Sequence, residues 1–189
     1  VWKQAEATEA TLRGLAAPGI LHLATHALFL PEHIGATPLS GALLILAGAS
    51  HFGQSTDTTT DGVATALELS NLNLRGTQLV VLSACNSGSG EWRVGQDVFG
   101  LRRPFMLAGA ENVVVSLWQV GDESGRLLMD RYYRYLLAGW GRVEALRQAE
   151  LSFYHQGRPI FEWASFIALG QDRPLVGAAV RGKSDLEAL

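Results

Sequence analysis

Leu79-Val80-Val81-Leu82-Ser83-Ala84-Cys85 is a short apolar run, rich in β-branched residues, that ends in the only cysteine of the chain. A glycine-rich turn, Asn86-Ser87-Gly88-Ser89-Gly90, follows it. A second run, Ile20-Leu21-His22-Leu23-Ala24-Thr25-His26, ends in the same way with a histidine. Short apolar runs without strict alternation are typical of strands covered on both faces, as in parallel sheets. The two runs therefore predict two buried strands, each with one reactive side chain at its carboxyl end.

Residues that finish adjacent parallel strands lie at one edge of a sheet, where ligands bind. If the two strands are neighbours, Cys85 and His26 meet there. A thiol needs a nearby base to become a good nucleophile, and histidine supplies one and later protonates the leaving amine. Small flanking residues leave room for a substrate backbone, and the backbone N–H groups of Ala27 and Cys85 are predicted to hold a developing oxyanion. The alternative is that both side chains only pack, since free cysteine is often buried.

The whole chain has the composition of an ordinary globular protein. Its 189 residues are 48% apolar and 17% charged, which predicts one domain with a substantial core. The net charge of −3, without a long basic run, argues against nucleic-acid binding. A single cysteine excludes an internal disulfide and predicts a reducing, cytoplasmic compartment. No apolar run reaches membrane-spanning length, so no membrane partner is expected. Because the chain begins at Val1, we expect a fragment or a processed product.

Strand and helix patterns alternate along the chain, which predicts an α/β fold with a mainly parallel central sheet flanked by helices. The predicted strands are Ile20–Ala24, Leu43–Leu46, Leu79–Ala84, Val113–Leu117 and Phe166–Leu169. The predicted helices are Trp2–Leu15, Thr65–Leu72, Asp97–Ala108, Glu123–Leu137 and Val143–Tyr154. Thr65 and Glu68 have the spacing of a capping box at the start of the second of these helices. We expect one domain over residues 1–170 and a C-terminal tail over 171–189.

The order of the motifs resembles the CHAT-domain family of caspase-like cysteine peptidases, which are related to separases. The resemblance runs from about Ala7 to Gly170. It rests on Leu21-His22-Leu23-Ala24-Thr25-His26, Leu39-Ser40-Gly41, Leu79 through Cys85 with Gly88, Gly100-Leu101, Leu107-Ala108-Gly109-Ala110, Val114-Val115-Ser116-Leu117-Trp118 and Trp163-Ala164-Ser165-Phe166. The family usually has His-Gly where this chain has His26-Ala27, and alanine keeps the N–H that an oxyanion hole needs.

The resemblance implies a caspase-like fold and hydrolysis of peptide bonds in a protein or peptide substrate. His26 matches the catalytic histidine of the family and Cys85 matches its nucleophile. Family members are often prokaryotic and are often fused to helical tetratricopeptide (TPR) repeats, so a TPR region or a regulatory partner is expected. The competing interpretation is an interaction or scaffold module that has kept the fold without the activity.

Three further residues are predicted to contact substrate. Asp122 stands where the similar separases carry an acidic residue that faces a basic side chain, which predicts cleavage after Arg or Lys. Its alternative role is to cap the helix that begins at Glu123. Asp97 is a second acidic candidate, also with a capping alternative. Trp118 is a candidate pocket wall, although an aromatic residue after a buried strand also suits the core.

Other motifs point to no cofactor. Gly177 through Ser184 matches the phosphate-loop pattern, but no strand–loop–helix context surrounds it, so we interpret it as part of the tail. The five histidines and one cysteine lack the paired spacing of zinc sites, so no metal is expected.

Overall fold

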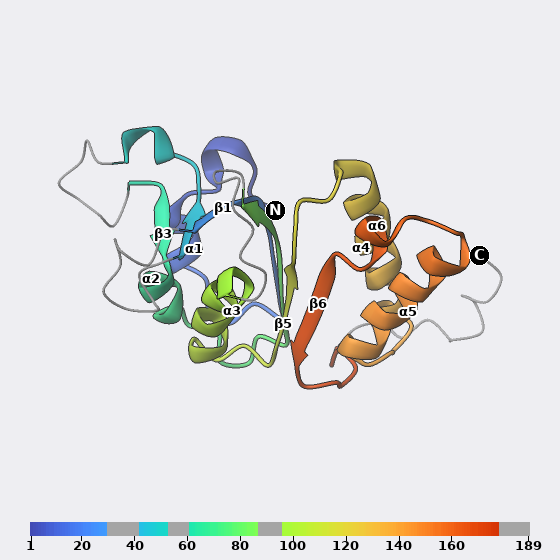
Figure 1. The fold of residues 1–189 in the computed structure, drawn as a ribbon. Helices are drawn as coiled ribbons and strands as arrows, with labels where there is room; N and C mark the ends of the chain where they lie inside the picture. Colours follow the sequence, from blue (N-terminus) through green and yellow to red (C-terminus); the bar gives the residue numbers. More distant parts are fainter. Residues whose placement is uncertain (30–41, 53–60, 87–95, 178–189) are drawn as a thin grey trace. The chain divides into compact units, whose positions relative to one another are not determined.

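The computed structural model describes residues 1–29, 42–52, 61–86 and 96–177 (Figure 1). The chain divides into two compact units, Val1–Val115 and Ser116–Leu189. The first unit contains β1 (Ile20–Phe29), β2 (Ala42–Ile45), β3 (Val63–Thr65), β4 (Leu79–Asn86) and nearly all of β5 (Asn112–Ser116). Its helices are η1 (Gln4–Glu6), α1 (Glu9–Arg13), η2 (Ala49–His51), α2 (Ala66–Ser70) and α3 (Gln96–Leu107). The second unit contains α4 (Asp122–Leu137), α5 (Arg142–His155), α6 (Ile160–Trp163) and β6 (Phe166–Gly170).

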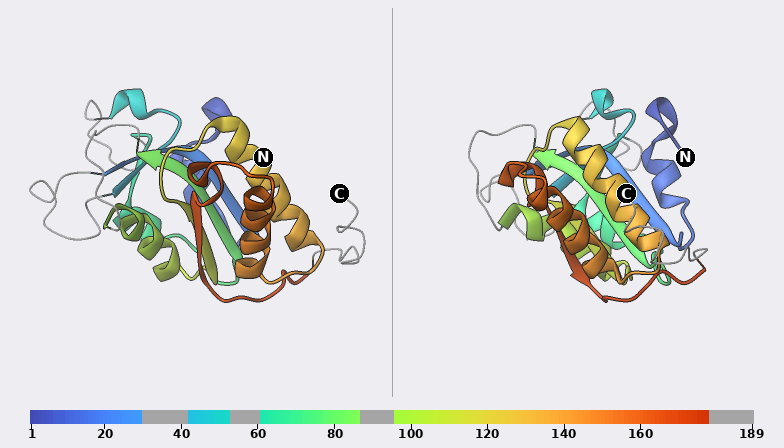
Figure 2. Two further views of the ribbon diagram at one scale, coloured as in Figure 1. Left: turned by 45° about the vertical axis from the view of Figure 1, so that its right-hand side comes forward. Right: turned by 90° about the vertical axis from the view of Figure 1, so that its right-hand side faces the viewer.

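The strands of the first unit follow the order β3-β2-β1-β4-β5. The central strands β1, β4 and β5 are parallel, whereas β1–β2 and β2–β3 are antiparallel. Figure 2 shows β1 and β4 running side by side. The fold is therefore α/β with a parallel centre, as the alternating pattern predicts. The short strand β3 and the helix α6 were not predicted, because each is too short to show a clear period.

Burial of its side chains explains why the cysteine run forms a strand. Leu79, Val80, Val81 and Leu82 are all at most 1% exposed, so both faces of β4 are covered. A strand covered on both faces needs no alternation of polar and apolar residues, and the run in the sequence shows none. Helices α2 and α3 pack against each other and against β2.

Strand β1 is longer than predicted. It was expected to stop at Ala24, yet it continues through His26 to Phe29. The reason is a non-local pairing: residues His26 to Phe29 pair antiparallel with Ile45 to Ala42 of β2. The Thr25 hydroxyl also donates to the Ile45 carbonyl, which ties the two strands together. His26 therefore lies inside a strand, three residues before its end.

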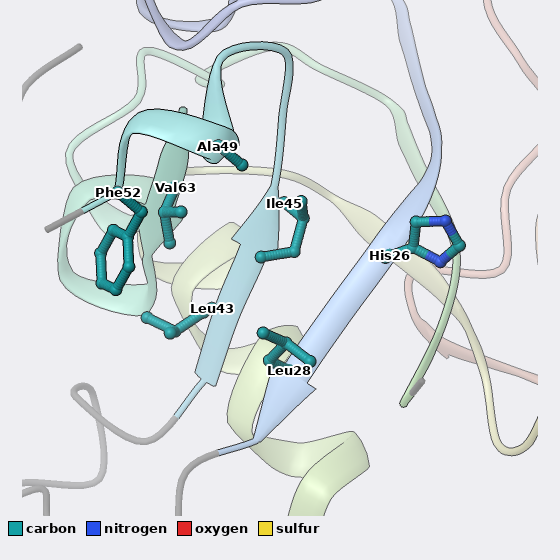
Figure 3. Close-up of a pocket in the computed structure, with 7 residues that line it drawn as sticks. All are labelled: His26, Leu28, Leu43, Ile45, Ala49, Phe52 and Val63. Atoms are coloured by element: carbon teal, nitrogen blue, oxygen red, sulfur yellow. The ribbon is translucent and has the colours of Figure 1, made fainter. Parts of the chain in front are cut away.

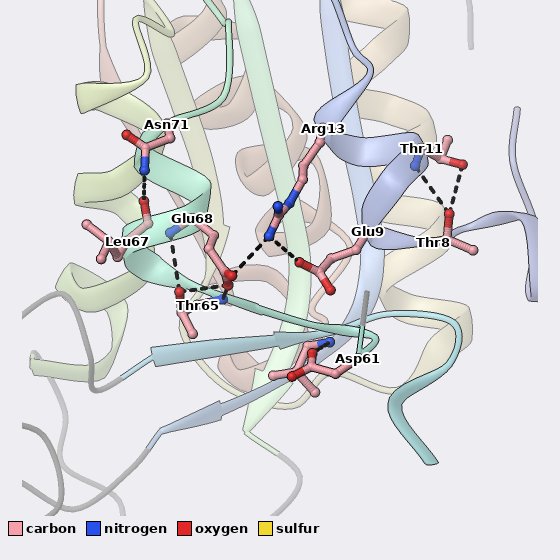
Figure 4. Close-up of polar contacts among 10 residues, drawn as sticks. Thr8, Glu9, Thr11, Arg13, Asp61, Thr65, Leu67, Glu68 and Asn71 are labelled. Carbon is pink, nitrogen blue, oxygen red and sulfur yellow. Dashed lines mark hydrogen bonds and ion pairs between the residues drawn. The ribbon is translucent and has the colours of Figure 1, made fainter. Parts of the chain in front are cut away.

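Helix α2 begins with the predicted capping box (Figure 4). The backbone N–H of Glu68 donates to the Thr65 hydroxyl at 3.2 Å, and the backbone N–H of Thr65 donates to the Glu68 carboxylate at 2.8 Å. Arg13 of α1 donates both to this carboxylate, at 3.0 Å, and to Glu9, at 2.8 Å. The capping box thus also connects α2 to the N-terminal helix.

In the second unit, the buried side chains of α4 and α5 form the core. They include Leu128, Tyr132, Leu136, Ala145, Ala149 and Phe153. The segment after β6 is attached to this unit, because the Asp172 carboxylate accepts hydrogen bonds from the backbone N–H groups of Val143 and Glu144 at the start of α5. Leu175 is buried as well. The second unit thus includes described residues beyond Gly170. The boundary between the domain and the C-terminal tail at residue 170 stays a prediction.

Candidate active site

The two residues that the sequence singles out are partners in the sheet. In the parallel register of β1 and β4, His26 lies opposite Cys85, and Ala27 lies opposite Asn86. Neighbouring strands are about 4.8 Å apart, and register partners occupy the same face of a sheet. The backbones of His26 and Cys85 are therefore adjacent, as the predicted catalytic pair requires. The side chain of Cys85 and the predicted glycine-rich turn after it lie outside the described part of the chain.

His26 sits where the two pairing modes of β1 overlap. His26 and Ala27 have register partners on both sides, in β2 and in β4. Ala27 is fully buried, whereas His26 is exposed. In Figure 3 the imidazole extends away from the apolar side chains of β2 and β3. Pairing on both sides fixes the backbone of a strand, so the imidazole projects from a rigid support.

A second histidine, His22, precedes His26 by four residues on β1. The two share a face, since residues of one parity do so in a strand. Desolvation lowers the pKa of His22 below its usual value of 6.5. This shift favours the neutral form of the His22 imidazole.

The substrate-contacting candidates lie in different parts of the chain. Asp97 is the second residue of α3, and its side chain lies outside the described set. Asp122 and Trp118 belong to the second unit. Trp118 is half-buried, and its indole Nε1–H donates to the Phe161 carbonyl at 2.8 Å, so α6 fixes the position of this ring.

The capping role considered for Asp122 is wrong. Helix α4 begins at Asp122 itself, its N-cap is Gly121, and no side chain makes a cap hydrogen bond there. Asp122 is exposed in the first helical turn, where the helix dipole favours a carboxylate. The side chain of Asp122 therefore does not cap helix α4, the role that was the alternative to substrate binding.

A pocket beside His26 was not predicted. It is lined by His26 and Leu28 of β1, Leu43 and Ile45 of β2, Ala49 of η2, Phe52, and Val63 of β3 (Figure 3). Its volume is about 330 Å³. The signal for it in the sequence is weak, because Leu43 and Ile45 look like core residues until the strand order shows which face they share.

The described residues contain no group of three or more His, Cys, Asp or Glu side chains arranged to hold a metal ion. The prediction that catalysis needs no metal or cofactor stays a prediction. Within the same residues, no helix combines the length and the apolar character needed to cross a bilayer.

The fold and the strand register together define a class: an α/β protein with a parallel sheet in which a histidine and a cysteine are paired on neighbouring strands. A family model described as the CHAT domain matches residues 2–171. The chain therefore belongs to the CHAT-domain family, which is related to cysteine peptidases.

Two curated relatives carry the name tetratricopeptide repeat protein 28. The protein from Mus musculus is 33% identical over 115 residues, and the protein from Homo sapiens is 30% identical over 114 residues. Each alignment covers 57% of this chain and 4% of the relative. The aligned part is thus a small portion of those long proteins, and the relatives associate this domain with TPR repeats.

Proposed function

We propose that this chain is a cysteine endopeptidase that hydrolyses peptide bonds of a protein or peptide substrate through a dyad of Cys85 and His26. The observation that carries the proposal is the register of β1 and β4, in which these two residues are partners. Membership of the CHAT-domain family supports it. The exposed position of His26 supports it as well, because a general base must reach a substrate.

In the proposed reaction, His26 takes the proton of the Cys85 thiol, and the thiolate attacks the scissile carbonyl carbon. The backbone N–H groups of Ala27 and Cys85 stabilise the oxyanion of the tetrahedral intermediate. The intermediate collapses to a thioester as the C–N bond breaks and His26 gives its proton to the leaving amine. Water then attacks the thioester, His26 takes the proton of that water, and the carboxylic acid product and the free thiol are released.

For specificity, we propose that Asp122 selects a basic residue before the cut, with Asp97 and Trp118 as further substrate contacts. Two observations support the role of Asp122: its carboxylate is exposed, and it makes no cap hydrogen bond. A carboxylate forms strong charge-assisted hydrogen bonds with Arg. The hydrogen bond from Trp118 to Phe161 would keep a pocket wall rigid.

The second candidate is a catalytically silent interaction module. The observation that favours it is that the relatives are named for their TPR repeats. In either case we infer a cytoplasmic protein that works with a TPR region or a regulatory partner, and that binds neither nucleic acid nor membrane. The two candidates differ in one respect, since only the peptidase requires a reactive thiol at position 85.

The test is to incubate the chain with peptidyl chloromethyl ketones that carry Arg, Leu or Asp next to the ketone, and to locate the adduct by mass spectrometry. We expect the Arg compound to alkylate Cys85 and the Cys85→Ala variant to take up none. His26→Ala should slow alkylation by about 100-fold or more, because the thiolate loses its base. Iodoacetamide is the control reagent, since it reports an accessible thiol that lacks peptide recognition. Reaction of Cys85 with iodoacetamide alone would favour the interaction module.

A further inference from the structure

The lining residues of the apolar pocket beside His26 differ in their exposure. Leu43 and Val63 are buried lining residues, whereas Phe52 has 54% of its surface exposed. Leu28 and Ile45, which also line it, are half-buried. His26 is one of the lining residues, so the pocket lies beside the proposed catalytic histidine.

The sheet fixes the side of the dyad on which this pocket lies. Strand β1, which carries His26, stands between β4, which carries Cys85, and β2. Ile45 of β2 is the antiparallel register partner of His26. The order across the sheet is therefore Cys85, then His26, then the pocket.

The chemistry of the dyad assigns a part of the substrate to that side. The imidazole must reach the leaving nitrogen to protonate it, so the leaving amine lies on the His26 side of the thiol. The polypeptide that follows the scissile bond then continues from His26 toward β2. Strands are about 4.8 Å apart and an extended chain advances about 3.3 Å per residue, so roughly three residues cover the distance from β4 to β2.

We propose, on the basis of the peptidase function above, that this pocket binds a bulky aliphatic or aromatic side chain from the three residues that follow the cut. Leu28, Leu43, Ile45, Phe52 and Val63 then determine specificity on the leaving-group side. A cavity of about 330 Å³ with an apolar wall is large enough for one such side chain. Among the described lining residues, all but His26 are apolar, so burying an acidic or basic side chain against them is costly.

The experiment uses a sequence-diverse set of synthetic peptides, with cleavage positions and rates read by mass spectrometry. We expect kcat/KM to be about tenfold or more higher for peptides with Leu, Ile or Phe at one of these positions than for matched peptides with Asp or Lys. The variant Phe52→Asp should lower kcat/KM for the apolar peptides by about tenfold and shift the preference toward Lys. Because Phe52 is exposed, this substitution leaves the core intact.

Two controls separate the pocket from the dyad. Leu67→Asp places the same charge on an equally exposed apolar residue, 57% exposed on α2 and outside the pocket lining, and should leave the preference unchanged. The chloromethyl ketones occupy only the side before the cut, so in the wild-type chain their reaction with Cys85 reports on the dyad independently of the side chains that follow the cut. Labelling of Cys85 without any apolar preference after the cut would overturn this inference and leave the peptidase proposal standing. Absence of both labelling and cleavage would overturn both.

Discussion

Glu150 of α5 should make the stability of the second unit depend on pH. Its carboxyl group is half-buried, and burial raises its pKa from 4.5 to about 7. A group whose pKa is raised by folding holds its proton in the folded state at pH values where the unfolded chain has released it. The contribution of Glu150 to the free energy of unfolding should therefore be highest below pH 4.5 and should fall as the pH rises toward 7.

The magnitude follows from the two pKa values. The difference between 4.5 and about 7 corresponds, at about 1.36 kcal/mol per pH unit, to about 3 kcal/mol. Partial contact with water reduces this figure, so we expect about 2 kcal/mol. Replacing Glu150 by Gln removes the ionisation and keeps the shape. The Glu150→Gln variant should match the wild type near pH 4.5 and exceed its stability by about 2 kcal/mol at pH 8.

Urea unfolding at pH 5, 6, 7 and 8, followed by tryptophan fluorescence, measures this difference. Trp118, Trp140 and Trp163 all belong to the second unit and report on its unfolding. Equal pH profiles for the wild type and Glu150→Gln would refute the reasoning, because they would mean that the carboxyl group is as well solvated in the folded state as in the unfolded chain.

Glu144 on the same helix supplies a matched control of opposite sign. Arg147 donates two hydrogen bonds to its carboxylate, at 2.7 and 2.8 Å, and these bonds together with one from Gln148 lower its pKa to about 2. A lowered pKa gives stability that is present above pH 4.5 and is lost as the pH falls. The pair is solvent-exposed and screened, so the loss in Glu144→Gln at pH 7 should stay well below about 1 kcal/mol.

Two further predictions concern the first unit. Thr65→Ala removes the hydroxyl that accepts from the Glu68 N–H and should lower the free energy of unfolding by about 1 kcal/mol in urea denaturation, with Thr65→Ser restoring it; an Ala variant as stable as the wild type would contradict the cap. Gly62 has a φ of +80°, and a Cβ atom there would lie 2.2 Å from the Ala49 nitrogen. Gly62→Ala should therefore lower the melting temperature more than Gly76→Ala does, because Gly76 has a similar φ of +94° but open space around it. Equal decreases in melting temperature would contradict the close contact.

The local parts of the fold could be predicted from the sequence. The buried run before Cys85 indicates a strand because its residues are apolar on both faces, and the spacing of Thr65 and Glu68 indicates a helix start because capping is a contact within one turn. The antiparallel pairing of β2 with the end of β1 could not be predicted. It joins residues that are distant in the sequence, and it determines where β1 ends.

The same limit applies to the candidate site. The sequence singles out Cys85 and His26 by their positions in two similar runs, but their opposition in the sheet depends on a strand order that periodicity does not encode. The capping role considered for Asp122 failed because Gly121 takes the N-cap position, one residue earlier than the pattern of acidic residues implies. Pocket residues were missed because each of them also suits a core.

The overlap of two pairing modes at His26 links the proposals. The parallel partner of His26 is Cys85, and its antiparallel partner is Ile45, which lines the pocket. A residue held between a parallel and an antiparallel neighbour has little backbone freedom, so the attachment point of its imidazole keeps a constant relation to both neighbouring strands. A peptidase requires that relation, because the same imidazole must take a proton from the thiol and deliver it to an amine on the opposite side. A module that only binds partners would need the pocket but not the thiol. If Cys85→Ala abolishes cleavage but keeps the binding of apolar peptides, the thiol acts in catalysis and the pocket acts in binding.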